Sequence, residues 1–339
     1  MKILMFTDVH IGKHHSNNFY MDLDKKVIDI IVERSKNDID QLIFLGDLVH
    51  TRGEIHQKAL DMVRYYLDKL NNIGIPVKMI LGNHDLLYEK NKSVNYFNVF
   101  DGLFKNIEFI TDMKQVDNML YVGWLQNDKE LQWYRDIEED YEFIFGHFEF
   151  KDTKLNEKYK TDFGVENNNK KSMIFSGHYH GRTIQDNLYY IGTPYPSDWG
   201  HKNNDSYGLC ILDTKTKKVK FEDLDLFHYR ELKMTDVIYN LLTDVEVTRK
   251  LFTGNEVIVI PDDNISPKKL YELRLLLNSF EPKNLVMEPV LQFNSEDKIK
   301  YDNIILSSPD EFINNYINEL TLEEEQKKRI KEKVETIMS

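Results

Sequence analysis

The stretch MKILMFTDVHIG at residues 1–12 sets an aspartate and a histidine at the end of a short, mostly apolar run. A continuous apolar run of this length is typical of a buried strand, and the glycine that follows lets the backbone turn sharply at the end of the strand. The same order returns in QLIFLGDLVH at residues 41–50 and in VKMILGNHD at residues 77–85. The sequence therefore predicts repeated strands whose ends carry polar side chains of the kinds that bind ligands.

The first 230 residues keep this rhythm of strand, polar turn and helical segment, which is typical of an α/β chain. Helical spacing of apolar residues is found at 23–32 and 56–73. The runs that predict strands are residues 1–6, 41–45, 77–81, 119–124, 141–145, 171–175 and 188–191, with a hairpin at 207–226. Because strands outnumber helices, we expect an α/β (α+β) fold whose core is a two-sheet β-sandwich with flanking helices, and not one doubly wound sheet.

After about residue 230 the character of the chain changes. Residues 256–260 and 285–293 predict strands, and residues 267–280 predict a helix between them. The end of the chain is charged and shows helical spacing of its apolar residues. We therefore expect three parts: a main domain at 1–230, a small α/β capping domain at 231–303 and a helical C-terminal segment at 304–339.

The charge balance limits the classes of protein. The 44 lysines and arginines are outnumbered by 57 aspartates and glutamates, so the net charge is −13 at pH 7. This argues against a free-standing basic nucleic-acid clamp and against a membrane-surface binder. Cys210 is the only cysteine, which excludes a disulfide framework and a Cys-rich zinc module. No stretch approaches about 18 apolar residues, so we expect a cytoplasmic protein without a membrane segment.

Polar residues with ligand chemistry stand at five strand ends, each beside a glycine. They are Asp8 and His10, Asp47 and His50, Asn83 with His84 and Asp85, His147, and His178 with His180. The carboxyl ends of strands in α/β sheets line a common crevice, so groups far apart in sequence can converge there. One buried histidine is more often a hydrogen-bonded core residue than a ligand, but chance does not explain five such sets. Nitrogen and oxygen donors without a thiolate favour manganese, iron or zinc, and Asp47 is the natural bridge between two cations.

Five motifs carry a resemblance to a known family. They are DVHIG at 8–12, GDLVH at 46–50, GNHD at 82–85, GH at 146–147 and GHYH at 177–180. In this order they resemble the signatures of calcineurin-like metallophosphoesterases, over about residues 1–225. Together with GTPYPS at 192–197, their local forms resemble the nuclease subunits of the SbcD or Mre type, which work with an SbcC or Rad type ATPase. The length, the small second domain and the helical tail resemble the compact form of this subunit in T-even phages.

The resemblance implies a site for two divalent metal ions, typically manganese, with magnesium as the other candidate. It assigns Asp8, His10, Asp47 and His180 to one ion, and Asp47, Asn83, His147 and His178 to the other. The two cations would lower the pKa of a water molecule that attacks phosphorus, and would neutralise the charge that builds on the phosphoryl oxygens.

Three further residues receive catalytic roles from the same resemblance. His84 matches the catalytic histidine of the family, which protonates the leaving oxygen or steadies the transition state. Asp85 is expected to accept from the other ring nitrogen of His84 and so to fix its tautomer. His50 matches a second family histidine near the substrate phosphate, where a catalytic and a supporting role both stay open.

The implied function is a manganese-type DNA nuclease that acts as an exonuclease on duplex ends and as an endonuclease on single strands. It would be the nuclease subunit of an ATPase-coupled complex in double-strand-break repair, recombination and replication, in the host cytoplasm if a phage encodes it. Its partners would be DNA, an SMC-like ATPase held by the C-terminal helices, and a second copy of the chain. The apolar stripe of helix 56–73 could serve that dimer, or pack on its own sheet.

Two alternatives from other classes stay open at this point. Protein phosphatases and cyclic-nucleotide phosphodiesterases also use two metals, and GDLVHTRG at 46–53 resembles the phosphatase form of that motif. The chain departs from this form, because His50 stands where phosphatases have an aspartate and GNHD stands where they have GNHE. A degraded site that only binds an ATPase is the other alternative, and the five intact motifs argue against it.

Overall fold

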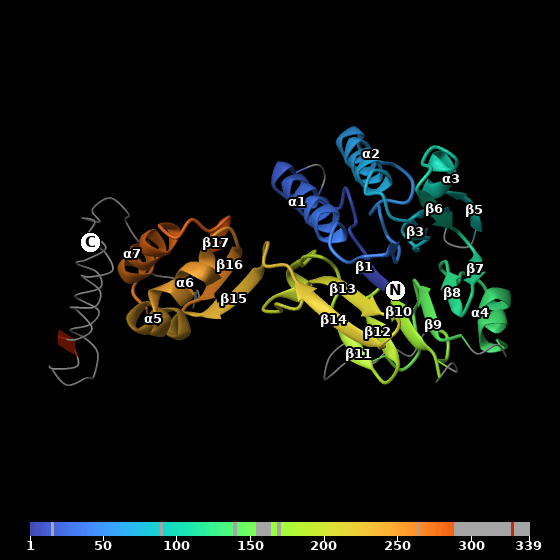
Figure 1. The fold of residues 1–339 in the computed structure, drawn as a ribbon. Helices are drawn as coiled ribbons and strands as arrows, with labels where there is room; N and C mark the ends of the chain where they lie inside the picture. Colours follow the sequence, from blue (N-terminus) through green and yellow to red (C-terminus); the bar gives the residue numbers. More distant parts are fainter. Residues whose placement is uncertain are drawn as a thin grey trace. The chain divides into compact units, whose positions relative to one another are not determined.

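The chain divides into two compact units in the computed structural model (Figure 1). The first unit holds residues 1–197 and 204–226, and the second holds residues 198–203 and those from Phe227 onward. The structure describes residues 1–14, 17–88, 91–137, 141–153, 164–167, 171–262, 265–287 and 327–328. The helices expected in the C-terminal segment therefore lie outside the described residues, apart from the short helical piece at 327–328.

The first sheet of unit 1 has the strand order β14-β13-β1-β2-β3-β6. Its strands are β1 (Lys2–Phe6), β2 (Gln41–Phe44), β3 (Val77–Ile80), β6 (Ile107–Ile110), β13 (Gly208–Asp213) and β14 (Lys218–Asp223). Strands β1, β2, β3 and β6 run parallel, whereas β13 runs antiparallel to β1 with Lys2 opposite Asp213. The carboxyl ends of β1, β2 and β3 therefore lie at the same edge of the sheet.

The second sheet of unit 1 has the strand order β11-β12-β10-β9-β8-β7. Its strands are β7 (Met113–Val116), β8 (Met119–Val122), β9 (Phe143–Gly146), β10 (Met173–Ser176), β11 (Thr183–Gln185) and β12 (Leu188–Tyr190). Strands β8, β9, β10 and β12 are parallel, and the last residues of β9 and β10, Gly146 and Ser176, are paired. This sheet also presents several carboxyl ends together.

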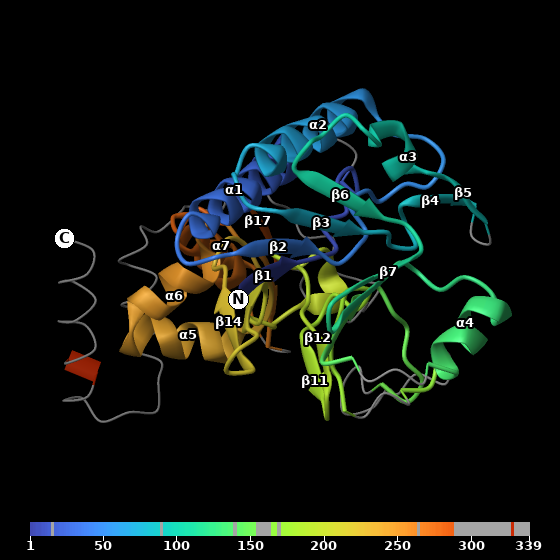
Figure 2. The ribbon, with the colours of Figure 1, turned by 45° about the vertical axis from the view of Figure 1, so that its right-hand side comes forward.

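The two sheets pack face to face through one buried apolar cluster, to which Met5, Ile43, Phe145 and Phe175 belong. Side chains alternate along a strand, so neighbours such as Phe44 face the other side of the first sheet. Helices α1 (Asn18–Ser35) and α2 (Gln57–Asn71) lie along that outer face (Figure 2). The expected sandwich with flanking helices is confirmed, and so is the hairpin, which is formed by β13 and β14.

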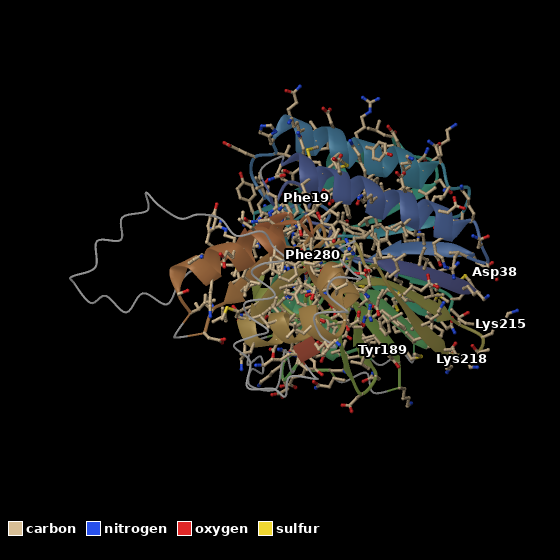
Figure 3. The ribbon with its side chains drawn as sticks, turned by 90° about the vertical axis from the view of Figure 1, so that its left-hand side faces the viewer. Phe19, Asp38, Tyr189, Lys215, Lys218 and Phe280 are labelled. Carbon is tan, nitrogen blue, oxygen red and sulfur yellow. The ribbon has the colours of Figure 1, made fainter. Side chains whose placement is uncertain are left out.

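Short elements lie between successive strands of the same sheet. Between β3 and β6 of the first sheet are β4 (Leu86–Tyr88), β5 (Asn91–Asn95) and α3 (Tyr96–Phe100), and between β8 and β9 of the second sheet is α4 (Asp128–Arg135). Lys215, in the turn between β13 and β14, and Lys218, the first residue of β14, are exposed, and the exposed Asp38 lies on the same side of unit 1 (Figure 3). This polar edge is the one at which β1 begins, because Lys2 pairs with Asp213 there.

Unit 2 contains a three-stranded parallel sheet of β15 (Tyr229–Lys233), β16 (Glu256–Ile260) and β17 (Asn284–Val286). Its helices are α5 (Met234–Thr243), α6 (Val245–Phe252) and α7 (Pro267–Asn278), and Asp198–Asn203 contributes the short 3-10 helix Trp199–His201. Val257, Val259 and Leu273 belong to one buried cluster that holds these elements together. None of the described helices is long and apolar enough to cross a bilayer.

A buried carboxyl group links α1 to the loop after β12. The Tyr195 hydroxyl donates to Asp24 Oδ1 at 2.6 Å, and both side chains are almost wholly removed from solvent. Burial raises the pKa of Asp24 to about 7, since the charged form loses its hydration, while the hydrogen bond from Tyr195 acts in the opposite direction. The folded protein therefore favours the protonated form of Asp24.

This burial predicts a pH-dependent effect of Asp24→Asn on stability. Because the folded pKa lies above the unfolded value, the wild-type chain loses stability as pH rises from about 4 to about 7. The asparagine stays neutral and keeps an acceptor for Tyr195, so the variant should gain about 2–4 kcal/mol relative to wild type over this range. Urea unfolding at several pH values measures it. A stability difference that does not change with pH would show that Asp24 does not titrate as expected.

Candidate metal centre

The seven expected metal ligands lie together at the carboxyl ends of five strands. The first sheet supplies Asp8 and His10 after β1, Asp47 after β2 and Asn83 after β3, and the second supplies His147 after β9 and His178 and His180 after β10. The centre thus forms where the ends of the two packed sheets meet. All seven are buried or half-buried.

One group of ligand atoms surrounds the ring of His10. Its Nε2 atom lies 3.0 Å from Nε2 of His180, 3.6 Å from Oδ2 of Asp47 and 3.8 Å from Oδ1 of Asp8. Two imidazole nitrogens and two carboxylates thus face one small volume. This is the set that the family resemblance assigns to one cation.

A second group surrounds the amide oxygen of Asn83. Oδ1 of Asn83 lies 2.9 Å from Nε2 of His147 and 3.1 Å from Nδ1 of His178. Nε2 of His147 is also 3.4 Å from Oδ2 of Asp47. The same Asp47 oxygen therefore faces both groups, which is the position that a bridging ligand needs.

The backbone at these strand ends adopts an uncommon conformation. Asp8, His10, Asp47 and His178 have φ angles of 51°, 50°, 60° and 85°. Positive φ costs energy in non-glycine residues and is concentrated at functional sites. The amide of His10 donates to the carbonyl of Asp47 at 3.1 Å, so the two turns hold each other in place.

Two glycines allow the strand ends to approach one another. A Cβ atom on Gly46 would lie 2.4 Å from Nδ1 of His147, and one on Gly82 would lie 2.2 Å from Oδ1 of Asp47. Any larger residue would displace a ligand side chain. The glycines next to the polar motifs are therefore required by space, in addition to the turn that they permit.

Charge is unevenly distributed over the metal-free site. Burial lowers the pKa of His10 and lowers that of His178 to about 3, so both rings are neutral at neutral pH. Burial also acts to lower the pKa of His147, but Asp47 outweighs it and the value rises to about 9. The carbonyl of Leu45, 2.7 Å from Nδ1 of His147, accepts the proton on that nitrogen, so Nε2 faces Asp47.

This donor set fits a pair of divalent cations. Ligand atoms of Asp8, His10 and His180 lie within 4.8 Å of one another, and so do those of Asp8, Asp47 and His147. The donors are imidazole nitrogens and carboxylate or amide oxygens, which suit manganese, iron or zinc better than softer metals. A carboxylate of Asp47 shared by both cations and the neutral amide of Asn83 would limit the negative charge among the ligands.

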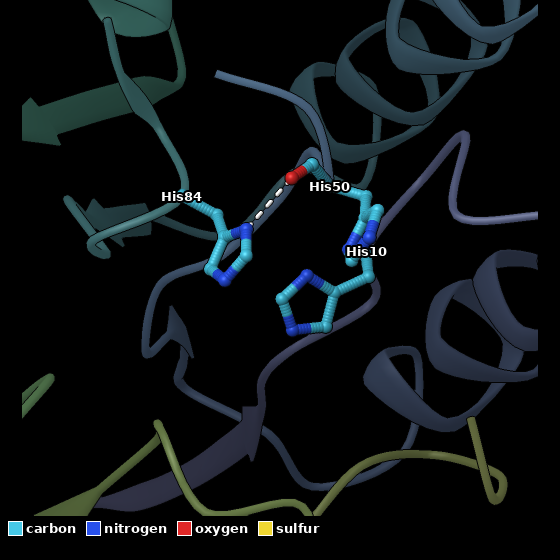
Figure 4. Close-up of side chains that lie close together, drawn as sticks. All are labelled: His10, His50 and His84. Atoms are coloured by element: carbon cyan, nitrogen blue, oxygen red, sulfur yellow. Dashed lines mark hydrogen bonds between the residues drawn. The ribbon is translucent and has the colours of Figure 1, made fainter. Parts of the chain in front are cut away.

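His84 lies close to His50 and to the expected ligand His10 (Figure 4). Its backbone amide donates to Oδ1 of Asp47 at 2.8 Å, and its Nδ1 lies 2.7 Å from the carbonyl oxygen of His50. The His50 ring stacks on the His84 ring with centroids 5.2 Å apart, and the His10 ring is 4.8 Å from it on another side. Nε2 of His84 is therefore the nitrogen left to exchange a proton with a substrate.

The expected contact between Asp85 and His84 is wrong. Nδ1 of His84 meets the carbonyl of His50 instead. Oδ2 of Asp85 accepts from the amides of Gly82 and Asp47 at 2.9 and 3.0 Å. Oδ1 accepts from the amides of Leu48 and Val49 at 2.9 and 3.3 Å. Asp85 thus shapes the turn that carries Asp47 and does not orient the His84 imidazole.

This arrangement predicts that Asp85→Asn is strongly destabilising. An asparagine can accept with one atom only, so two buried amides would lose their acceptor and face a donor group. Each buried donor left unsatisfied costs about 1–3 kcal/mol, so we expect a loss of about 2–5 kcal/mol in the free energy of unfolding. Urea denaturation of the metal-free protein measures this loss. A variant as stable as wild type would mean that the turn does not depend on this carboxylate.

Several side chains around the ligands were not anticipated from the sequence. The Thr7 hydroxyl donates to Oδ2 of Asp8 at 2.6 Å, and the ring of Trp124 lies 5.1 Å from that of His178. Ser197 lies 2.9 Å from the ring of His180. Thr7 directly precedes its aspartate, but Trp124 and Ser197 follow other strands, and no spacing rule connects them to the histidines.

A comparison with known protein families agrees with this arrangement of ligands. The chain belongs to the calcineurin-like phosphoesterase family, whose profile matches residues 1–182. That segment contains the seven expected ligands and His84. The chain is accordingly a metal-dependent phosphodiester hydrolase.

Two individual proteins and one solved structure are similar to this chain. Exonuclease subunit 1 of Enterobacteria phage T4 is 27% identical over 229 residues, which are 65% of this chain and 67% of that protein. Putative phosphoesterase 244L of Invertebrate iridescent virus 6 is 24% identical over 230 residues, 62% of this chain and 76% of that protein. Nuclease MPE of Pseudomonas putida superposes with a TM-score of 0.31 at 14% identity and covers 66% of this chain and 87% of its own.

Proposed function

We propose that this protein is a two-metal DNA nuclease that hydrolyses phosphodiester bonds at duplex ends and in single strands. The observation that carries the proposal is the convergence of seven nitrogen and oxygen donors, with Asp47 facing both groups and His84 beside them. The similarity to a phage exonuclease subunit supports nucleic acid as the substrate. Manganese is the cation that we propose, with magnesium as the alternative, because the family resemblance implies it and the carboxylate and amide oxygens of the donor set are compatible with it.

Different residues of the chain have different roles in the proposed reaction. When bound, the two cations activate a water molecule and neutralise phosphoryl charge. His84 keeps its Nδ1 proton on the His50 carbonyl, and as an imidazolium it gives the proton on Nε2 to the leaving oxygen and becomes a neutral imidazole. His50, half-buried and stacked on His84, keeps that ring from turning away. Asp85 holds the turn that presents Asp47 to both cation positions.

Because the net charge of the chain is negative, the positive charge that contacts DNA must come from basic residues near the site, from bound cations or from a partner protein. Two divalent cations provide part of this positive charge. Lys13, which directly follows Gly12 in the turn after His10, provides another part. We propose that the small domain at 231–303 and an ATPase partner add further DNA contacts. This partner would bind the C-terminal segment at 304–339, and the complex would act in double-strand-break repair, recombination and replication in the cytoplasm.

A second copy of the chain is also part of the proposal. On α2, Val63, Leu67 and Leu70 are buried in unit 1, so they cannot form an interface, but Leu60 is exposed. Val99 and Leu103, on α3 and just after it, are also exposed apolar residues. We propose that these residues take part in a homodimer, whose existence light scattering at micromolar concentration tests directly.

One experiment separates the nuclease from the other phosphoesterases. The pure protein is incubated with linear duplex DNA, single-stranded DNA, a nitrophenyl phosphodiester and a nitrophenyl phosphomonoester, with manganese or magnesium. Each reaction is run with and without ATP and the ATPase partner. Digestion of DNA supports the proposal. Turnover of the phosphomonoester alone, or no turnover of any substrate, would contradict it.

A further inference from the structure

The loop that follows β12 reaches back to a metal ligand. Oγ of Ser197 lies 2.9 Å from Nδ1 of His180, and the ammonium group of Lys13 donates to the same oxygen at 3.0 Å. Ser197 is 6% exposed, so water has little access to this contact. The other ring nitrogen of His180, Nε2, faces His10 in the ligand cluster.

The roles of these donors and acceptors follow from chemistry. A nitrogen that binds a cation carries no proton, so the proton of a neutral His180 must lie on Nδ1. Nδ1 then donates to Ser197, and Lys13 can only donate. Both hydrogen bonds end on the Ser197 oxygen, which therefore fixes the tautomer and the plane of the His180 ring.

The position of Ser197 is itself determined by buried contacts. The amide of Thr193 donates to the carbonyl of His180 at 3.0 Å, and the Thr193 hydroxyl donates to the carbonyl of Tyr195 at 2.8 Å. The Tyr195 hydroxyl is held by Asp24 on α1 at 2.6 Å. The loop thus forms hydrogen bonds with both the backbone and the ring of His180, and a further hydrogen bond connects the loop to α1.

We propose that Ser197 is a positioning residue for the cation that His180 holds. The inference rests on the proposed two-metal function and adds to it a side chain outside the ligand set. Hydrogen-bonding partners of metal-bound histidines typically contribute 10- to 100-fold to metal affinity. Because Ser197 contacts the ring of His180, which the resemblance assigns to one cation only, its loss should weaken one of the two cation positions and spare the other.

Manganese titration of the metal-free, full-length protein by calorimetry tests this inference. We expect two binding steps in wild type, and in Ser197→Ala one step weakened about 10- to 100-fold with the other within about twofold. Ser197→Thr keeps the hydroxyl and should restore the weakened step. Ser172→Ala is the matched control, since Ser172 is also buried and its hydroxyl binds the carbonyl of Tyr141, away from the ligands.

The outcomes distinguish this inference from the proposed function. Unchanged affinities in Ser197→Ala would overturn the positioning role, and so would an equal weakening of both steps. An effect that Ser172→Ala reproduces would also overturn it, because a general loss of stability would then explain the result. A wild-type protein that binds two manganese ions but cleaves no DNA would overturn the nuclease proposal alone, and the variant titrations would still decide the role of Ser197.

Discussion

Replacing Asp47 by asparagine should reduce manganese-dependent phosphodiester cleavage by about 10³-fold or more and weaken both cation positions. Oδ1 of Asp47 accepts from the amide of His84 at 2.8 Å, and the oxygen of an asparagine would keep that contact. Its NH₂ group would then replace Oδ2, the atom that faces His10 and His147. A donor would stand where both cations need an acceptor.

Calorimetric titration with manganese and hydrolysis of a nitrophenyl phosphodiester measure the two effects. Asp213→Asn is a suitable control, because Asp213 lies at the opposite end of the same sheet, on β13. If the Asp47 variant bound one manganese ion with wild-type affinity, Asp47 could not be the bridging ligand.

Replacing His84 by glutamine should have an equally large effect on catalysis but not on metal binding. We expect cleavage to fall by about 10²- to 10⁴-fold, the usual contribution of a positioned general acid. Both manganese ions should remain bound, because His84 reaches Asp47 through its backbone amide, which the substitution keeps.

The two readouts for His84 are single-turnover cleavage of DNA and manganese titration of the same preparation. His56→Gln is the control, since His56 precedes α2, is exposed and is not part of the ligand cluster. Loss of one manganese ion in the His84 variant would show that this histidine is a ligand and not an acid.

Much of unit 1 could be predicted from the sequence because its strands are short, apolar and followed by turn residues. The expected strand at 41–45 is observed at Gln41–Phe44, and the expected hairpin is observed as β13 and β14. The strand at 256–260 was also predicted correctly in unit 2. The sequence pattern was decisive wherever a strand is buried on both faces, because apolar side chains are then continuous.

Other elements could not be predicted for physical reasons. Strands β5 and β7 are largely exposed, so their sequences lack the apolar pattern that marks a strand. Helix α4 is mostly polar and has only one buried residue, Tyr134. For β5 and β7, pairing with the neighbouring strands β4 and β8 decides the conformation.

The candidate site could likewise be predicted only in part from the sequence. The motifs bring together the seven expected ligands because each follows a strand whose carboxyl end lies at a shared edge. The roles of Asp85 and Ser197 could not be assigned from the sequence, since both depend on how turns fold over one another. Asp85 meets amides of two different turns, and Ser197 reaches His180 from a separate loop. Hydrogen bonds between loops leave no periodic trace in the sequence.

The pairing of β1 with β13 has a consequence for biosynthesis. Strand β1 is synthesised well before β13, yet Lys2 pairs with Asp213. At about 5–20 residues per second, one edge of the nascent strand waits roughly 10–40 s for its partner. During this interval an apolar strand with unpaired amides can associate with other nascent chains. We therefore expect unit 1 to complete its fold only after translation has passed β13, and chaperones that cover exposed strands to raise its yield.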